Sequence, residues 1–264
     1  MNPETFFPAG LEARHFFIVC PLVFAAGFVD SVAGGGGLIS LPAYLLAGLP
    51  VHAALGTNKL SSIMGTAAAS WRYFKNRCVD AGLALPGAAA ALAGSALGSS
   101  LTLRTGEQYL RLLLLLALPA AAFYVLRGRR FDAPVRPLSR RKTLVLSLVL
   151  SFIVGGYDGF FGPGAGTFLI LCYTGLARLD PRIAAGNAKW VNFASNAGAL
   201  GVFLVSRRVL LPLGLAAGLF SVAGAWLGSG LAIRRGGRII RLFILAALIL
   251  LFGKILYDTL LEVL

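Results

Sequence analysis

Four charged residues lie inside apolar stretches of this sequence and are candidates for chemistry. Asp30 and Asp158 are the acidic residues within such stretches, and Lys59 and Lys189 each lie a few residues into one. At the depth of a membrane helix a charge costs about 3 kcal/mol or more, so it usually has a cavity or a partner. The aspartates therefore predict proton coupling or an ion pair with a lysine. The lysines predict neutralisation of a substrate's negative charge.

Each charge also has a structural interpretation, which the sequence leaves open. Both lysines are close to a helix start, where a long side chain can extend along the helix toward the membrane surface. Each aspartate can lie near that surface and cap the next turn. Repetition of the same charges at matching places favours a shared role.

Two glycine-rich runs interrupt the apolar stretches. Backbone without helical hydrogen bonds is tolerated at membrane depth only where it is buried in protein or faces a wet cavity. The segment after each run begins with free N–H groups at the positive end of a helix dipole, which favours anions. The alternative is that small residues let helices cross closely. The candidate substrate-binding glycines are Gly34, Gly35, Gly36 and Gly37 in the first run and Gly162, Gly164 and Gly166 in the second.

Polar residues accompany each lysine along its stretch. A spacing of three or four residues places Asn58, Ser62 and Thr66 on one helical face, and Asn192 and Asn196 form the corresponding stripe. Such stripes predict a lined pathway, with hydrogen bonding between helices as the alternative. The candidate substrate-binding residues from these stretches are Thr57, Asn58, Lys59, Asn187, Lys189, Asn192 and Asn196.

These features occur twice along the chain. The sequence Gly56-Thr57-Asn58-Lys59 is matched by Gly186-Asn187-Ala188-Lys189 at an offset of 130, and the glycine runs match at an offset of 128. An apolar chain that is doubled and broken by glycines is typical of a secondary transporter.

The composition excludes a soluble domain. The chain of 264 residues is 58% hydrophobic and 13% charged, with a mean hydropathy of +0.82. Several stretches reach the ~20 residues that cross a bilayer as a helix. The net charge of +14 collects in short loops between apolar runs, which argues against nucleic-acid binding and orients membrane helices. We therefore expect an all-α integral membrane protein with about 8–10 membrane segments.

The chain divides into an N-terminal tail (1–15), a first repeat (16–126), a basic linker (127–142) and a second repeat (143–264). The second segment of each repeat is only about a dozen residues long, which predicts a half-helix or a re-entrant element. The predicted segments are 16–33, 37–48, 53–74, 82–102 and 109–126, then 143–159, 165–177, 183–205, 210–232 and 239–257.

The distribution of Lys and Arg predicts the topology. With the seven positive charges of the linker inside, inverted repeats place sixteen basic residues inside and six outside, whereas parallel repeats give fourteen and eight. The positive-inside rule favours the inverted arrangement, with both termini outside. We expect a multi-pass protein of the cell inner (plasma) membrane.

Motifs for other chemistry are missing from the sequence. No GxxxxGK[ST], HExxH or GxSxG occurs, and Cys20, Cys78 and Cys172 form no CxxC pattern. We therefore expect no enzyme, no metal and no cofactor. The expected partners are a small anionic substrate and the lipid bilayer, with no nucleic acid; a homo-oligomer is left open.

The segment GFVDSVAGGGGLISLPAYLLAGLPVHAALGTNKLSS (27–62) resembles the first repeat of the sulfite exporter TauE/SafE family of membrane permeases. The glycine run, the following Pro42 and the GTN motif after a Gly-x-Pro turn carry the resemblance, which extends over about residues 16–257. The second half departs from the pattern, with GPGAGTF in place of a fuller glycine run and Ile170 in place of a proline. The resemblance implies a permease for small organic or inorganic anions, sulfite and sulfonates among them.

We therefore predict a secondary transporter that exports small anions by alternating access with proton coupling. Its site lies between the two repeats near the midplane, framed by residues 33–37 and 162–166. The alternative is a membrane scaffold that presents basic loops to a cytoplasmic partner, but a scaffold does not need charged and amide side chains at costly depth. The weaker second glycine run predicts an asymmetric site in a symmetric scaffold.

Overall fold

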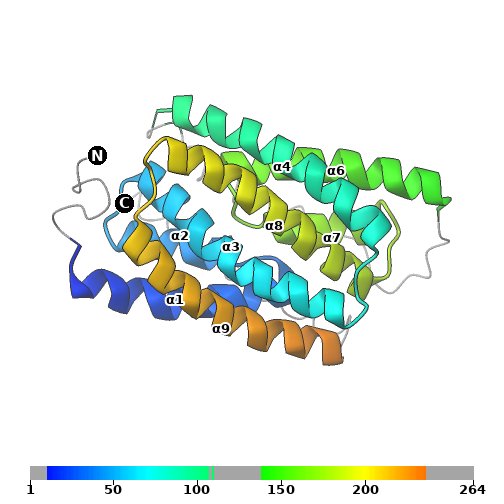
Figure 1. The fold of residues 1–264 in the computed structure, drawn as a ribbon, viewed down its shortest axis with the longest axis horizontal. Helices are drawn as coiled ribbons and strands as arrows, with labels where there is room; N and C mark the ends of the chain where they lie inside the picture. Colours follow the sequence, from blue (N-terminus) through cyan, green and yellow to red (C-terminus); the bar gives the residue numbers. More distant parts are fainter. Residues whose placement is uncertain (1–10, 107–108, 110–137, 236–264) are drawn as a thin grey trace, which may run out of the picture.

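The computed structural model describes residues 11–106, 109 and 138–235, and every regular element within these ranges is an α-helix (Figure 1). The prediction of an all-α chain is confirmed for this part. The predicted segments 109–126 and 239–257 fall outside it, apart from Tyr109. The helices are α1 (Ala13–Ala33), α2 (Gly37–Leu46), α3 (Val51–Lys75), α4 (Ala81–Arg104), α6 (Arg140–Phe160), α7 (Ala165–Gly175), α8 (Pro181–Val205) and α9 (Leu211–Arg235).

Four of these helices, α1, α4, α6 and α9, are long and apolar enough to cross a membrane. The short helices α2 and α7 have 10 and 11 residues, close to the predicted length. The remaining pair, α3 and α8, have 25 residues each and carry the two lysines. Their polar residues are compatible with a membrane because more than half of each helix is buried by its neighbours.

The long helices pack in the order α1, α9, α3, α8, α4, α6. In Figure 1, α4 and α6 form the upper side, α1 and α9 the lower side, and α3 and α8 lie between them. The outer helices therefore cover the two polar helices on two sides (Figure 1).

Helices α1 and α6 run in opposite directions, and so do α3 and α8, and α4 and α9 (Figure 1). In Figure 1, α1, α3 and α9 run from left to right, and α4, α6 and α8 run from right to left. Helices α1 and α6 have 21 residues each, and α4 and α9 have 24 and 25. Because α1 and α3 run the same way, α2 must return the chain toward the end where α1 begins. By the same reasoning α7 returns the chain between α6 and α8.

Glycines with positive φ make the two breaks. Gly34 (φ 80°) ends α1, and its N–H donates a 2.7 Å hydrogen bond to the Asp30 carbonyl oxygen. Gly162 (φ 98°) and Gly164 (φ 80°) precede α7. Residues with a side chain rarely adopt this conformation, so glycine allows the chain to reverse within three or four residues.

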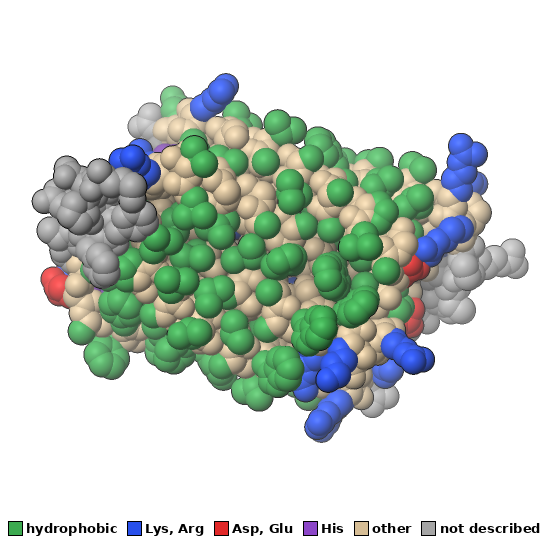
Figure 2. Space-filling view, viewed as in Figure 1, with side chains coloured by type: hydrophobic (Ala, Val, Ile, Leu, Met, Phe, Trp, Pro, Cys, Tyr) green, Lys and Arg blue, Asp and Glu red, His purple; other side chains and the backbone are tan. Residues whose placement is uncertain are grey.

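Side chains on the surface divide into an apolar middle and charged ends (Figure 2). Most described basic residues gather where α3 and α9 end and where α6 and α8 begin. This is the set that the sequence placed on one side of the membrane. It comprises Arg72, Lys75, Arg77, Arg140, Arg141, Lys142, Arg178, Arg182, Arg234 and Arg235, against Arg14, Arg104, Arg207 and Arg208 at the other end.

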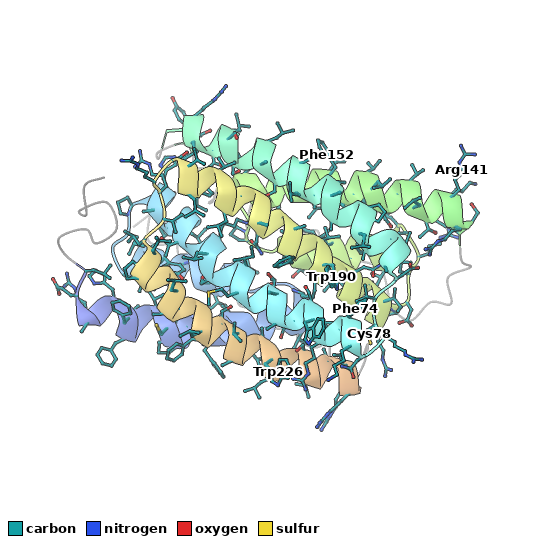
Figure 3. The ribbon with its side chains drawn as sticks, viewed as in Figure 1. Phe74, Cys78, Arg141, Phe152, Trp190 and Trp226 are labelled. Carbon is teal, nitrogen blue, oxygen red and sulfur yellow. The ribbon has the colours of Figure 1, made fainter. Side chains whose placement is uncertain are left out.

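Aromatic side chains border the basic end. Phe74 and Trp190 contact edge to face, with ring centroids 5.9 Å apart (Figure 3). The Arg72 guanidinium lies 4.7 Å from the ring centroid of Trp226. Aromatic and basic residues together are typical of the boundary between a bilayer and water.

Candidate functional site

The four candidate charges form two buried ion pairs. The Lys59 Nζ lies 2.8 Å from the Asp158 Oδ1, and the Lys189 Nζ lies 2.8 Å from the Asp30 Oδ2. Each pair joins a lysine of one half to an aspartate of the other. The sequence predicted either an ion pair or proton coupling for these aspartates, and the structure brings the charges together.

Both pairs are almost completely removed from the surface. The side chain of Lys189 is 0% exposed and that of Lys59 is 3% exposed, whereas their partners Asp30 and Asp158 are 17% and 6% exposed. Removing one partner of a buried pair typically costs about 3–5 kcal/mol, because the other charge is left uncompensated. Neither lysine reaches a membrane surface, so the snorkelling alternative does not describe this geometry.

The two pairs differ in their additional contacts. The Lys189 Nζ also donates a 2.5 Å hydrogen bond to the Asp30 carbonyl oxygen, and the Gly36 N–H donates to the Asp30 Oδ1 at 3.4 Å. On the other pair, the Ser195 hydroxyl donates to the Asp158 Oδ2. The residue that matches Ser195 at the offset of 130 is Gly65, so Asp30 receives no equivalent hydroxyl.

A small polar cavity lies beside the first break. It has a volume of about 30 Å³, room for about two water molecules. Most of its lining consists of glycines and polar or charged side chains from α1, α2, α3, α6, α7, α8 and α9. The predicted site residues that line it are Asp30, Gly34, Gly36, Gly37, Asn58, Lys59, Asp158, Gly162, Gly166, Asn192 and Asn196.

Five predicted site residues, all within the described ranges, do not line this cavity: Gly35, Thr57, Gly164, Asn187 and Lys189. Two of them have clear structural contacts. The Thr57 Oγ1 accepts a 3.0 Å hydrogen bond from the Leu210 N–H, and the Asn187 Oδ1 accepts a 2.9 Å bond from the Asp80 N–H. Both therefore connect a central helix to the loop before a helix of the other half.

The two breaks make different hydrogen bonds beside the cavity. At the start of α7, the Thr167 N–H donates to the Gly34 carbonyl oxygen at 3.2 Å, and the Thr167 hydroxyl donates to the Ala33 carbonyl oxygen at 2.9 Å. Thr167 in the first turn of α7 is therefore bound to the end of α1. Gly36 and Gly37 at the start of α2 line the cavity, and so does Gly166 at the start of α7. The positive ends of both short helices lie at the cavity, but the Thr167 N–H of α7 already has a backbone partner.

Amide groups complete the cavity. The Asn196 Nδ2 donates to the Asn192 Oδ1 at 3.2 Å, and the Ser62 hydroxyl donates to the Asn58 Oδ1 at 3.5 Å. Within the described residues, the NH₂ groups of Asn58 and Asn192 donate to no protein atom, although both side chains are more than nine-tenths buried. A ligand in the cavity can therefore accept hydrogen bonds from both of them.

Sequence reasoning did not place several residues of this centre. Ser195 precedes Asn196 of the predicted polar stripe, and its contact with Asp158 was not predicted. Ser40, Gly65 and Ser221 also line the cavity. Alignment of the repeats carries a signal for one of them, since Gly65 stands where the second half has Ser195.

Apolar outer helices, short helices at two central breaks and a buried charged centre define a polytopic helical membrane protein. The chain belongs to the Sulfite exporter TauE/SafE family, whose match covers residues 19–255. The resemblance noted from the glycine run and the GTN motif is thereby confirmed.

Similar proteins from bacteria carry transporter names. The chain is 39% identical over 236 residues to "Probable membrane transporter protein ORF9" of Sinorhizobium sp, covering 89% of this chain and 90% of that protein. It is 33% identical over 235 residues to a "Probable membrane transporter protein" of Haemophilus influenzae, covering 89% and 92%. It is 32% identical over 251 residues to "Probable membrane transporter protein YfcA" of Escherichia coli K12, covering 92% and 93%. No solved structure matches the chain.

Proposed function

We propose that this protein is a secondary transporter for small anions such as sulfite, sulfonates or related organic acids, which it exports across the inner membrane. The observation that carries the proposal is the set of groups around the cavity. The Lys59 ammonium, the start of α2 and the NH₂ groups of Asn58 and Asn192 present positive charge or hydrogen-bond donors. The two carboxylates that line the same cavity, Asp30 and Asp158, have their charges matched by Lys189 and Lys59. Together the donors suit an oxyanion better than a cation or an apolar solute.

The size of the cavity limits the substrate. A volume of about 30 Å³ holds only about two waters, so a bound oxyanion must be small, or the helices around it must separate. Separation of the helices would fit a transporter that cycles between closed and open states, in which substrate enters when one side opens.

Alternating access is supported by the arrangement of the halves. Counterpart helices run in opposite directions (Figure 1), as expected for inverted repeats. The ion pairs and the hydrogen bonds of Thr57 and Asn187 each join one half to the other. We propose that the halves rock against each other around this centre, with the basic end in the cytoplasm.

Proton coupling follows from the charge of the centre. Two lysines and two aspartates form neutral pairs, so an entering anion adds an uncompensated negative charge in a buried environment. Such a charge is strongly disfavoured unless a cation accompanies it. A proton on Asp30 or Asp158 removes the excess charge, so the anion and the proton cross together in the same direction. Export is then driven by the outward gradient of the anion, and an imposed pH gradient in vesicles drives both species.

Transport by purified protein in proteoliposomes tests the proposal. Sulfite and a short alkyl sulfonate serve as probes, with Lys59→Met and Asn192→Leu as site variants. Each loses a donor to the anion, so we expect uptake to fall by about tenfold or more in Lys59→Met. Lys75→Met, at the exposed basic end, is the control and keeps the wild-type rate. Wild-type protein that moves none of the probe anions, or folded Lys59→Met protein that moves them at the wild-type rate, overturns the proposal.

A further inference from the structure

We infer that the two ion pairs have different roles in transport: Lys59–Asp158 opens to admit the anion while a proton binds to Asp158, and Lys189–Asp30 stays closed throughout. This inference rests on the proposed function and names which of the two aspartates couples protons. It assigns different roles to two ion pairs that consist of the same residue types.

Access to the cavity distinguishes the pairs. Lys59 and Asp158 both line the cavity, whereas Lys189 does not and is 0% exposed. An anion that enters can therefore contact the Lys59 ammonium directly. It can reach Lys189 only by displacing Asp30 and the backbone around it.

The contacts of Asp30 explain why its pair must stay closed. Lys189 binds both the carboxylate and the carbonyl oxygen of Asp30, and the carboxylate also accepts from the Gly36 N–H. The Asp30 carbonyl oxygen also accepts from the Gly34 N–H that ends α1. Opening this pair would therefore loosen the break itself.

The contacts of Asp158 allow its pair to open. Its second carboxylate oxygen accepts from the Ser195 hydroxyl, so Asp158 keeps a partner on α8 after Lys59 turns to the anion. The neighbouring Tyr157 hydroxyl donates to the Pro163 carbonyl oxygen at 2.7 Å and is not needed by the carboxylate. The chain therefore holds Asp158 in position in both states.

The charges near Asp158 determine how many protons accompany each transported anion. Lys59 faces it from α3, and Asp30 lines the same cavity from α1, with its own charge matched by Lys189 of α8. The centre is neutral when empty, so a monoanion brings one excess negative charge. One proton on Asp158 restores neutrality, whereas a dianion would leave one charge unmatched. The centre therefore carries monoanions with one proton each.

Binding of the proton to Asp158 and of the anion to Lys59 requires no other reactant. A proton from the aqueous side bonds to a carboxylate oxygen of Asp158, which becomes a neutral acid. The Lys59 ammonium keeps its three protons and exchanges its hydrogen-bond acceptor from that carboxylate to an oxygen of the anion. Release reverses both changes, with the proton leaving Asp158 as the ion pair reforms.

Asp158→Asn and Asp30→Asn test this division, since asparagine imitates the protonated acid at matched positions. We measure exchange of labelled for unlabelled sulfite without a pH gradient, and accumulation driven by a pH gradient. Asp158→Asn should retain exchange and lose gradient-driven accumulation. Asp30→Asn should give less folded protein, but the folded fraction should still respond to the gradient. Gradient-driven accumulation by Asp158→Asn, or loss of coupling in Asp30→Asn alone, overturns the inference.

Ser195→Ala tests the same point while keeping both charges of the pair. Without the hydroxyl, the ionised carboxylate of Asp158 is less stabilised, so the pH of half-maximal uptake should rise by about one unit. Ser99→Ala is the control, because the Ser99 hydroxyl donates to the Ser95 carbonyl oxygen on α4 and not to Asp158. A pH profile of Ser195→Ala that superimposes on the wild type overturns the inference. Absence of transport by the wild-type protein instead rejects the proposed function.

Discussion

Thr57 of α3 and Asn187 of α8 make equivalent contacts in opposite halves of the protein. Each side-chain oxygen accepts a hydrogen bond from a backbone N–H just before a helix of the other half, Leu210 for Thr57 and Asp80 for Asn187. These two residues therefore hold the loops before α9 and α4 against the central helices.

Substituting them should affect stability and not substrate affinity. Thr57→Val and Asn187→Leu each leave a backbone N–H without its partner, which costs about 1–3 kcal/mol when the group is buried. We expect lower thermal midpoints in detergent and an unchanged KM for the transported anion. Asn58→Ala gives the contrasting pattern, since Asn58 lines the cavity. A raised KM in Asn187→Leu, at wild-type stability, would instead show that Asn187 takes part in substrate binding.

Gly56 and Gly186 mark the closest approaches between a central helix and a loop. A Cβ at Gly56 would lie within 2.2 Å of the Arg208 carbonyl oxygen, and one at Gly186 within 1.8 Å of the Cys78 carbonyl oxygen. Neither backbone atom can move away independently, so we expect Gly56→Ala and Gly186→Ala to lower stability by about 1–3 kcal/mol or more.

Gly201→Ala is the control for these two substitutions. It lies within α8, and a Cβ there would meet nothing within 4 Å. Alanine favours helix over glycine by about 1 kcal/mol, so this variant should be as stable as the wild type or more stable. Thermal unfolding of the three variants in the same detergent measures the difference. Equal midpoints for all three would contradict the close contacts.

Asp30 and Lys189 should show strong coupling in a double-mutant cycle. Lys189→Met leaves the buried Asp30 carboxylate without its main partner, at a cost of about 3–5 kcal/mol. Adding Asp30→Asn removes the uncompensated charge and should recover part of that loss. The free energy of unfolding of both single variants and the double variant gives the coupling energy. Additive losses would show that the two side chains do not interact.

Asp80 predicts a dependence of stability on pH at the basic end. Its carboxylate receives hydrogen bonds from the Arg140 guanidinium, which lower its pKa from 3.8. A lowered pKa in the folded state contributes stability that is present above pH 3.8 and lost as the pH falls through the lower folded value. The pair is partly exposed, so we expect a small effect. The thermal midpoint of wild-type protein should fall more between pH 5 and pH 3 than that of Asp80→Asn.

Several features of the fold follow from the sequence because they depend on local pattern. The glycine runs predicted two breaks, and the short segments after them became α2 and α7 of 10 and 11 residues. The polar residues around Lys59 and Lys189 predicted two helices with polar faces. These helices are α3 and α8, and more than half of the residues of each are buried. Hydropathy and glycine content record these properties within a few residues of chain.

The site was less predictable because it depends on contacts between residues that are far apart in sequence. Asp30 and Lys59 lie in the same half, yet each pairs with a residue of the other half, at Lys189 and Asp158. Thr57 and Asn58 are adjacent, but one faces a loop and the other the cavity. Residue type gives the capacity for hydrogen bonding and not its direction. Likewise, the Thr167 N–H of α7 donates to the end of α1 only because the fold places the Gly34 carbonyl oxygen opposite it.

The exchange of ion-pair partners has a consequence for assembly. Within residues 11–106 and 138–235, each half contributes one lysine and one aspartate to the centre, and these two side chains pair with the other half and not with each other. Two fragments made from a gene cut between residues 110 and 137 should therefore each be insufficient alone yet reconstitute the centre when they are produced together. The reciprocal pairing thus makes the charges of the two halves complementary, so each half needs the other to neutralise its part of the centre.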